Sequence, residues 1–204
     1  MQVHWLTTFD KIFEFEQQLA KYTGAAYAVM TDCCTHAIEL CLRFDKIKQC
    51  EFTAYTYLSI PMTMHKLGIE YQYIDQSWIG EYQFINTRIW DCARRLESNM
   101  YRPNTLMCLS FQYKKHLNLG RGGMILTDDY KSAQLLKKMS YDGRLPNIPW
   151  REQDIEMQGF HYYMTPETAQ IGLSKLPNAI ATEPVKWTIN DWPDLTQMKV
   201  FKDK

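Results

Sequence analysis

The sequence predicts an α/β fold, in which helices pack on a sheet. Two observations predict it. Short apolar runs of strand length alternate with segments of helical periodicity along most of the chain. An acidic residue, Asp91, also directly follows an apolar run, as expected at the carboxyl end of a buried parallel strand. The 204 residues suffice for one domain with a sizeable core, or for one domain with a small appendage.

The first part of the chain predicts three strands and three helices. The first helix is expected over residues 9–22, because apolar residues recur at spacings near three and four and Gly24 supplies a typical helix end. Strands are then expected over residues 26–30, 52–56 and 69–75, and helices over 36–44 and 58–66.

The second part predicts three more strands and two more helices. The strands are one that ends at Asp91, one over residues 105–109 and one over 124–127, and the helices cover 130–140 and 166–176. Pro166 suits the first turn of the last helix. Residues 145–155 contain two prolines and predict a loop.

Charge and composition narrow the class of partner. The chain has 23 basic and 23 acidic residues and no basic block, so nothing favours nucleic-acid binding. Aromatic residues make up 14% of the chain, which suits a packed core and an interface. No apolar run approaches the roughly 20 residues that span a bilayer, so no membrane contact is expected.

The six cysteines predict reduced thiols. Most lie inside apolar runs, no Cys-x-x-Cys pair occurs, and the neighbours Cys33 and Cys34 have poor geometry for a disulfide. Zinc ligation is not expected, because the thiols lack ligand spacing. The acidic, aromatic N-terminus does not resemble a signal peptide. We therefore expect a cytoplasmic protein.

Three segments contain candidate functional residues. Lys114 and Lys115 lie in a loop between two apolar runs, and a lysine near an apolar wall and a second cation has a lowered pKa and can attack a carbonyl. Residues 31–37 join a strand to a helix, which presents free N–H groups to an anion. An ordinary turn capped by Thr35 is the competing interpretation. Asp91 follows its strand in the position where ligands of α/β sheets are bound.

The lysine segment resembles the cofactor-binding segment of the DegT/DnrJ/StrS sugar aminotransferases. In that family, Ser-Phe is followed by a lysine five residues after the Ser and then by Gly-Gly. Ser110, Phe111, Lys115 and the pair Gly122-Gly123 match this pattern, which selects Lys115 over Lys114. The resemblance extends over about residues 13–176. It implies a three-layer α/β/α sandwich with a mostly parallel sheet, reduced in size, as in the large domain of fold type I aminotransferases.

The resemblance also implies a pyridoxal phosphate site. Lys115 would hold the cofactor covalently, and Asp91 would pair with the protonated pyridine nitrogen, so that the ring can accept electrons. The remaining cofactor-binding residues implied by the family are Thr35, Cys34 and Ser110 at the phosphate, Tyr57 stacked on the ring, Arg94 near the ring hydroxyl, and His161 reaching the phosphate of a second chain. Solvent exposure of Arg94, a plain core or interface role for Tyr57, and an interface His161 without a ligand are the alternatives.

The sequence departs from the family pattern at single positions and in two regions. Cys34 stands where the family has Gly, Arg94 where it often has Gln or His, and His161 where it has Asn. Only fifteen residues, 76–90, stand where the family has a whole strand–helix unit, so that unit is missing or reduced to a stub. After Leu176 the family continues into a further domain, whereas 28 residues remain here. We therefore expect a cofactor-binding domain over residues 1–176 and a short C-terminal tail over residues 177–204.

The function that the resemblance implies is transfer of an amino group to a keto-sugar nucleotide by a ping-pong reaction, with an amino donor such as glutamate. A homodimer with a shared active site is expected. The competing hypothesis is a non-catalytic binding or assembly protein that keeps the fold. A plain α/β domain with accidental matches is the third.

Overall fold

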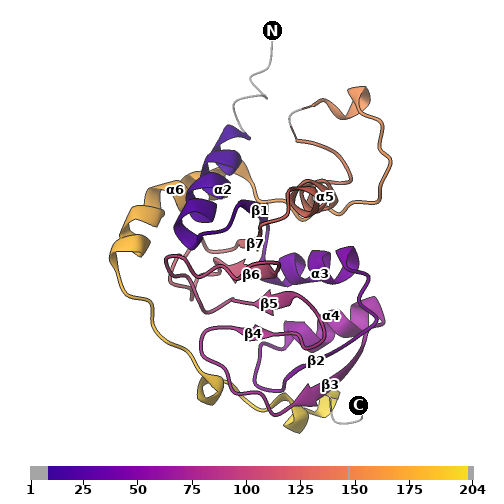
Figure 1. Cartoon of the computed structure of the whole chain (residues 1–204), viewed down its shortest axis with the longest axis vertical. Helices are drawn as coiled ribbons and strands as arrows, with labels where there is room; N and C mark the ends of the chain where they lie inside the picture. The colour runs from indigo at the N-terminus through magenta and orange to yellow at the C-terminus, as the bar shows by residue number, and fades with distance from the viewer. Residues whose placement is uncertain (1–8, 147, 202–204) are drawn as a thin grey trace.

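The computed structural model describes residues 9–146 and 148–201 and confirms an α/β fold with a central sheet (Figure 1). The helices are α2 (Asp10–Thr23), α3 (Cys34–Phe44), α4 (Ser59–Leu67), α5 (Tyr130–Ser140) and α6 (Pro166–Ala181). The strands are β1 (Tyr27–Thr31), β2 (Gln49–Thr53), β3 (Glu70–Ile74), β4 (Tyr82–Gln83), β5 (Ile89–Asp91), β6 (Leu106–Ser110) and β7 (Gly123–Thr127). Each predicted helix and strand has a counterpart, although β2 lies three residues earlier than expected.

The central sheet has the strand order β1-β7-β6-β5-β4, and β2 and β3 form a separate pair. A single antiparallel bridge between Glu51 and Ile85 brings this pair against the segment that follows β4, with the Ile85 N–H donating to the Glu51 carbonyl at 2.8 Å. Figure 1 therefore shows the seven strands in one succession from β1 to β3.

The expectation of a mostly parallel sheet is corrected by these pairings. Only β5–β6 and β2–β3 are parallel, whereas β1–β7, β6–β7 and β4–β5 are antiparallel. For β4–β5 and β6–β7, the reason is the length of the connections. Residues 84–88 and residues 111–122 return the chain directly to the neighbouring strand, which requires antiparallel pairing, while parallel neighbours need a long crossover.

Helices cover both faces of the sheet, so the three-layer arrangement is confirmed. On one face, α3, α4 and α5 bury residues such as Ile38, Met64 and Leu136 against Val29, Leu106 and Ile125. On the other face, α2 and α6 bury Phe15, Leu19 and Leu176 against Met107, Met124 and Leu126. Alternate residues of each strand thus enter opposite cores, as the pleat requires.

The C-terminal residues continue helix α6 and then pack against the rest of the fold. α6 continues to Ala181 with Pro177 inside it, so the boundary predicted after Leu176 falls within a helix. The chain then runs along the β4 side of the sheet toward the β2–β3 pair through the short 3-10 turns η2 (Ile189–Asp191), η3 (Leu195–Gln197) and η4 (Lys199–Phe201) (Figure 1). Leu195 and Phe201 are buried there.

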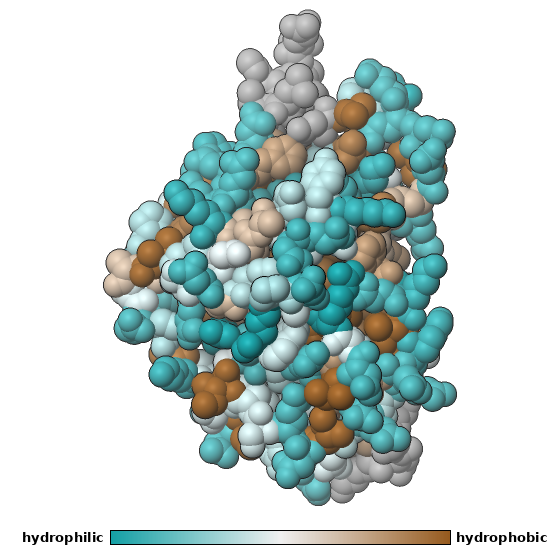
Figure 2. Space-filling view, viewed as in Figure 1, coloured by the Kyte–Doolittle hydropathy of each residue, from teal (hydrophilic) through white to brown (hydrophobic). Residues whose placement is uncertain are grey.

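The face in Figure 2 carries hydrophobic side chains in small groups among hydrophilic ones. Within the described residues, none of the helices has the length and apolar character needed to cross a membrane. All six cysteines are free in the structure, and five of them are buried.

Candidate active site

A cavity of about 700 Å³ lies where β5, β6 and the first turn of α3 meet the segment after β2. Seven of the eight residues predicted for the cofactor site line it: Thr35, Cys34, Tyr57, Asp91, Arg94, Ser110 and Lys115. The structure thus brings together residues from four separate segments of the chain. A drug-sized molecule fits a cavity of this size.

Lys115 belongs to the loop between β6 and β7, where its backbone N–H donates to the Gln112 carbonyl at 2.8 Å and closes a turn. Burial, and then the neighbouring Arg94 cation, lower the pKa of its amine to about 8. Its side chain is half-buried, whereas that of Lys114 is exposed. At neutral pH a larger share of Lys115 than of an ordinary lysine is in the nucleophilic, uncharged form.

Asp91 ends β5 and is only 6% exposed. Burial raises the pKa of its carboxyl above the usual value, and the Ala93 N–H, the Lys115 cation and the Tyr82 hydroxyl oppose that effect. The Ala93 N–H donates to Oδ1 at 2.8 Å, and Tyr82 donates to Oδ2 at 2.9 Å. The carboxylate is therefore fixed in orientation at the base of the cavity.

The first turn of α3 presents backbone N–H groups to the cavity. Its N-terminal donors have no partner within the helix, and the helix dipole adds partial positive charge. Thr35 lies in this turn, and its Oγ1 is 2.9 Å from Ser59 Oγ. The helix N-cap is Cys33, which makes no side-chain cap, so the competing interpretation of Thr35 as the cap is wrong.

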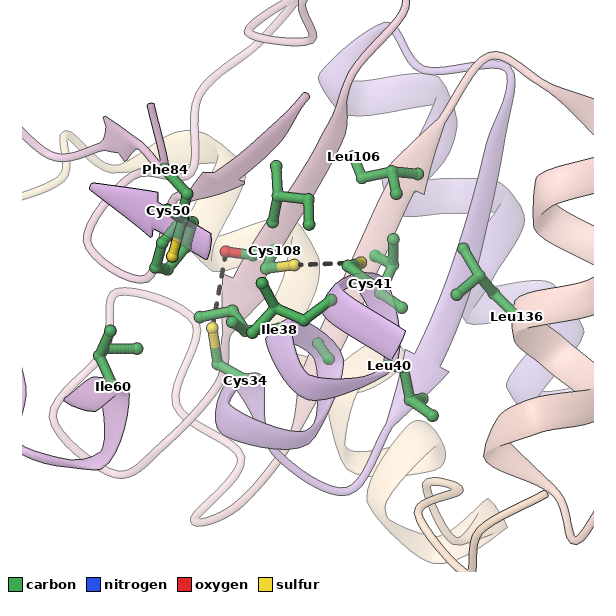
Figure 3. Close-up of a cluster of buried hydrophobic side chains, with 14 of the residues drawn as sticks. Cys34, Ile38, Leu40, Cys41, Cys50, Ile60, Phe84, Leu106, Cys108 and Leu136 are labelled. Atoms are coloured by element: carbon green, nitrogen blue, oxygen red, sulfur yellow. Dashed lines mark hydrogen bonds between the residues drawn. The ribbon is translucent and has the colours of Figure 1, made fainter. Parts of the chain in front are cut away.

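Cys34 begins α3, and its thiol points into the core. Sγ donates to the Cys108 carbonyl at 3.6 Å, and the neighbouring Cys41 and Cys108 sulfurs are 3.7 Å apart (Figure 3). Burial raises the pKa of the Cys34 thiol well above its usual value, so the thiol stays protonated. Cys34 can therefore serve an anion through its backbone N–H alone.

A glycine allows this turn to approach the sheet. A Cβ on Gly123, the first residue of β7, would lie 2.3 Å from the Cys33 carbonyl carbon and 2.5 Å from the Cys34 nitrogen. No larger side chain fits without a shift of one backbone. The Gly-Gly of the lysine segment is thus explained at its second position by the close contact between β7 and the start of α3.

The remaining predicted residues lie at the rim. Ser110 ends β6 beside the lysine loop. Tyr57 is 54% exposed, and its ring is 6.3 Å from that of Trp192. Arg94 lies against the Trp187 ring at 3.6 Å. Among the alternatives for Arg94, free exposure to solvent is therefore excluded.

His161 lies outside the cavity of its own chain. Its side chain is 71% exposed, and its Nδ1 is 3.0 Å from Asp142 Oδ2. The role foreseen for it concerns a second chain and stays a prediction.

Sequence reasoning missed two parts of the site. One is Tyr82, which the structure places opposite Asp91. The other is a charged cluster at the rim, in which Asp32 pairs with His36 at 2.6 Å and with Arg121 at 2.8 Å. The Asp32 hydrogen bond raises the pKa of His36 to about 9 despite burial, so the cluster carries a net positive charge at neutral pH. The spacing Asp32-x-x-x-His36 at a helix start could have suggested this pair.

Asp32, Cys33 and His36 also place possible metal-ligand atoms within 4.8 Å of one another. This group mixes a carboxylate, a thiol and an imidazole, so cysteine spacing alone does not reveal it. Arg121 already donates to Asp32 Oδ2, and its Nη2 lies 3.9 Å from Cys33 Sγ, so a cationic side chain contacts two of these three groups.

The fold resembles solved aminotransferase structures. A protein assigned as a PLP-dependent aminotransferase from Bacillus cereus ATCC 10987 matches with a TM-score of 0.70 and 16% identity, over 86% of this chain and 63% of that one. AtS13 from Actinomadura melliaura matches with a TM-score of 0.70 and 19% identity, over 83% and 60%. The sugar aminotransferase CalS13 from Micromonospora echinospora matches with a TM-score of 0.68 and 13% identity, over 83% and 60%. The chain spans less than two thirds of the length of these structures.

No curated protein matches the sequence. The model of the DegT/DnrJ/EryC1/StrS aminotransferase family, in contrast, matches residues 1–79 and 102–184. The gap between the two matched parts contains Asp91 and Arg94, which the structure nevertheless places in the cavity with Lys115. Since the match covers most of the chain, the protein belongs to the DegT/DnrJ/EryC1/StrS aminotransferase family.

Proposed function

We propose that the protein is a pyridoxal-phosphate-dependent aminotransferase that acts on a keto-sugar nucleotide. One observation carries the proposal. The amine of Lys115 and the carboxylate of Asp91 line one cavity, and the N-terminus of α3 opens on the same cavity. These are the three groups that a cofactor with an aldehyde, a basic ring nitrogen and a phosphate requires. The family implies pyridoxal phosphate as that cofactor.

The residues present fit the cofactor. The first-turn N–H groups of α3, with Thr35 and Ser110, would hold the phosphate, and the cationic cluster around Arg121 adds positive charge at the rim. Asp91 would hold the proton on the ring nitrogen, and a cationic nitrogen beside it would keep its carboxyl ionised despite burial. When bound, pyridoxal phosphate supplies an electron sink for the carbon that loses its proton.

Lys115 has two tasks in this proposal. It would bind the cofactor covalently at rest, and its freed amine would then accept the proton from the substrate carbon and return it. A pKa of about 8 suits both tasks, because the amine can accept and return a proton near neutral pH. An amino donor such as glutamate would deliver the amine in a first half-reaction, and the sugar would take it in a second, which is a ping-pong sequence.

The assignment of a sugar substrate rests on two structurally similar proteins. CalS13 is a sugar aminotransferase, and the DesI structure, which also resembles this fold, was determined with its TDP-sugar product. A homodimer with a shared site completes the proposal, with His161 of a second chain reaching the phosphate.

Titration with pyridoxal phosphate tests the proposal. A visible absorbance band should appear, borohydride should fix the cofactor, and peptide mapping should find it on Lys115. Lys114→Ala is the matched control and should label like the parent. Cofactor on Lys114, or equal labelling of Lys115→Ala, would overturn the assignment.

The second candidate is a binding or assembly protein without catalysis. The specific observation in its favour is that the family model leaves residues 80–101 unmatched, and these include Asp91 and Arg94. Incubation of the cofactor-loaded protein with glutamate and keto-sugar nucleotides separates the two. Loss of the visible band with release of 2-oxoglutarate supports the enzyme, and a stable band under all conditions supports the alternative.

A further inference from the structure

Arg94 lies between two tryptophans that come from the far end of the chain. Its guanidinium carbon is 3.6 Å from the centre of the Trp187 ring and 5.2 Å from that of Trp192. Arg94 follows β5, whereas both tryptophans belong to the segment after α6 (Figure 1). Such contacts combine cation–π attraction with flat stacking.

Hydrogen bonds hold the guanidinium only weakly. Nη1 donates to the Lys114 carbonyl at 3.3 Å, and Nε is buried without a hydrogen-bond partner. Among residues 9–146 and 148–201, no carboxylate lies within ion-pair distance of Arg94. An arginine beside a lysine would otherwise turn toward water, because like charges repel. The two rings make close contacts to the guanidinium, and the more distant carboxylates of Asp91 and Asp191 also attract it.

The tryptophan segment is itself anchored to the sheet side of the cavity. The Gly80 N–H donates to the Trp187 carbonyl at 2.8 Å, and Thr188 forms a β-bridge with Ile79. Thr188 and Asp191 make a reciprocal capping box that fixes η2 and delivers Trp192. Backbone hydrogen bonds and the capping box thus fix the positions from which both tryptophan rings project.

Arg94 and Lys115 share their surroundings. Both line the main cavity, and both line a second hollow of about 170 Å³ that is also lined by Trp187. The stack therefore holds a permanent positive charge next to the amine, in a place that water reaches only in part.

We propose that Trp187, assisted by Trp192, is a positioning residue of the active site that holds Arg94 beside Lys115. This inference rests on the proposed function of Lys115. The Arg94 charge is one of the two causes of the lowered pKa of Lys115, burial being the larger. The C-terminal segment is then part of the active site through its effect on Arg94.

The test measures the lysine directly in the full-length protein without added cofactor. Acetic anhydride labelling of Lys115, followed by peptide mass spectrometry across a pH series, reports the pKa of its amine. Trp187→Ala should shift the midpoint upward and slow labelling at pH 8 severalfold, whereas Trp187→Phe should keep most of the parent behaviour. Trp150→Ala removes another tryptophan, 61% exposed in the loop after α5, and should leave the midpoint unchanged.

A double substitution separates the charge from burial. Arg94→Gln alone should also raise the midpoint, and adding Trp187→Ala to it should give no further rise. A further rise would mean that Trp187 acts by excluding water, and an unchanged midpoint in Trp187→Ala would mean that Arg94 stays in place without it. Either result overturns the proposal. Neither depends on cofactor binding, so failure here is distinguishable from failure of the proposed function.

Discussion

Tyr82 and Asp91 face each other across the β4–β5 pair, and the Tyr82 hydroxyl donates a 2.9 Å hydrogen bond to Asp91 Oδ2. The same hydroxyl lies 2.7 Å from Thr56 Oγ1, so Thr56 can donate to Tyr82. This chain of hydroxyls favours the ionised form of a carboxyl that burial would otherwise neutralise.

Replacement of Tyr82 by Phe should raise the pKa of Asp91 further. The hydrogen bond favours the carboxylate, so its loss favours the protonated form. The acidic limb of the pH profile of kcat/KM should move to higher pH, because the ring nitrogen loses its ionised partner over a wider range. Tyr73→Phe, in β3 and outside the cavity, is the control. An acidic limb that coincides with that of the parent would remove Tyr82 from this role.

Asp91→Asn should abolish amino transfer and stabilise the protein at neutral pH. The folded-state pKa of Asp91 is raised, so burial favours the protonated form and stability is lost as pH rises through that pKa. Asn carries no charge and avoids this loss, which is on the order of 1 kcal/mol per pKa unit. Thermal unfolding should show a gain at pH 7 that shrinks as the solution is acidified. A variant that is less stable than the parent at pH 7, or that retains full half-reaction rates, would contradict this role.

Gly123→Ala should destabilise the protein and weaken cofactor binding together. The added methyl would lie 2.3 Å from the Cys33 backbone, so the start of α3 must move. Overpacking of this kind typically costs about 1–3 kcal/mol. Urea unfolding and cofactor titration measure the two effects. Gly68→Ala is the control, because its strain comes from a φ of +65° with no atom within 4 Å, so it should cost about 1 kcal/mol and leave cofactor affinity intact.

A mixture of Lys115→Ala and His161→Ala chains should regain activity that neither has alone. In a shared site, one of the two sites of a mixed dimer combines the intact Lys115 of one chain with the intact His161 of the other. An obligate interface of this kind buries more than roughly 2,000 Å². Light scattering at low micromolar concentration gives the assembly state. A monodisperse monomer that still binds the cofactor would exclude the shared site.

Most of the fold could be predicted because its signals are local. Periodic apolar residues and Gly24 predicted α2, which ends at Thr23 with Gly24 at a φ of 80°. The lysine segment could be identified from the sequence because its characteristic residues lie close together in the chain. Lys115 and Asp91 were predicted from separate segments, and the structure places them in one cavity.

What the sequence did not predict depends on contacts between distant segments. Tyr82 lies in a two-residue strand, too short for alternation to reveal. A hairpin interpretation of residues 82–91 around Asn86, which has a φ of 63°, would have placed Tyr82 opposite Asp91. The position of Trp187 against Arg94 has no local signal, because it depends on how the chain returns after α6. The comparison with the family pattern, in which only 28 residues remain after Leu176, predicted a tail there.

The pairing of β1 with β7 sets the order in which the chain can fold. β1 ends at Thr31, and its ladder partner begins at Gly123 and closes at Thr127. During synthesis, β1 therefore has no ladder partner until β7, and with it most of the chain, has left the ribosome. Contacts between residues so far apart in sequence form slowly, and β1 stays unpaired and exposed until they form. We expect truncated translation products that end before β7 to remain unfolded and to be bound by chaperones, whereas products that include β7 can close the sheet.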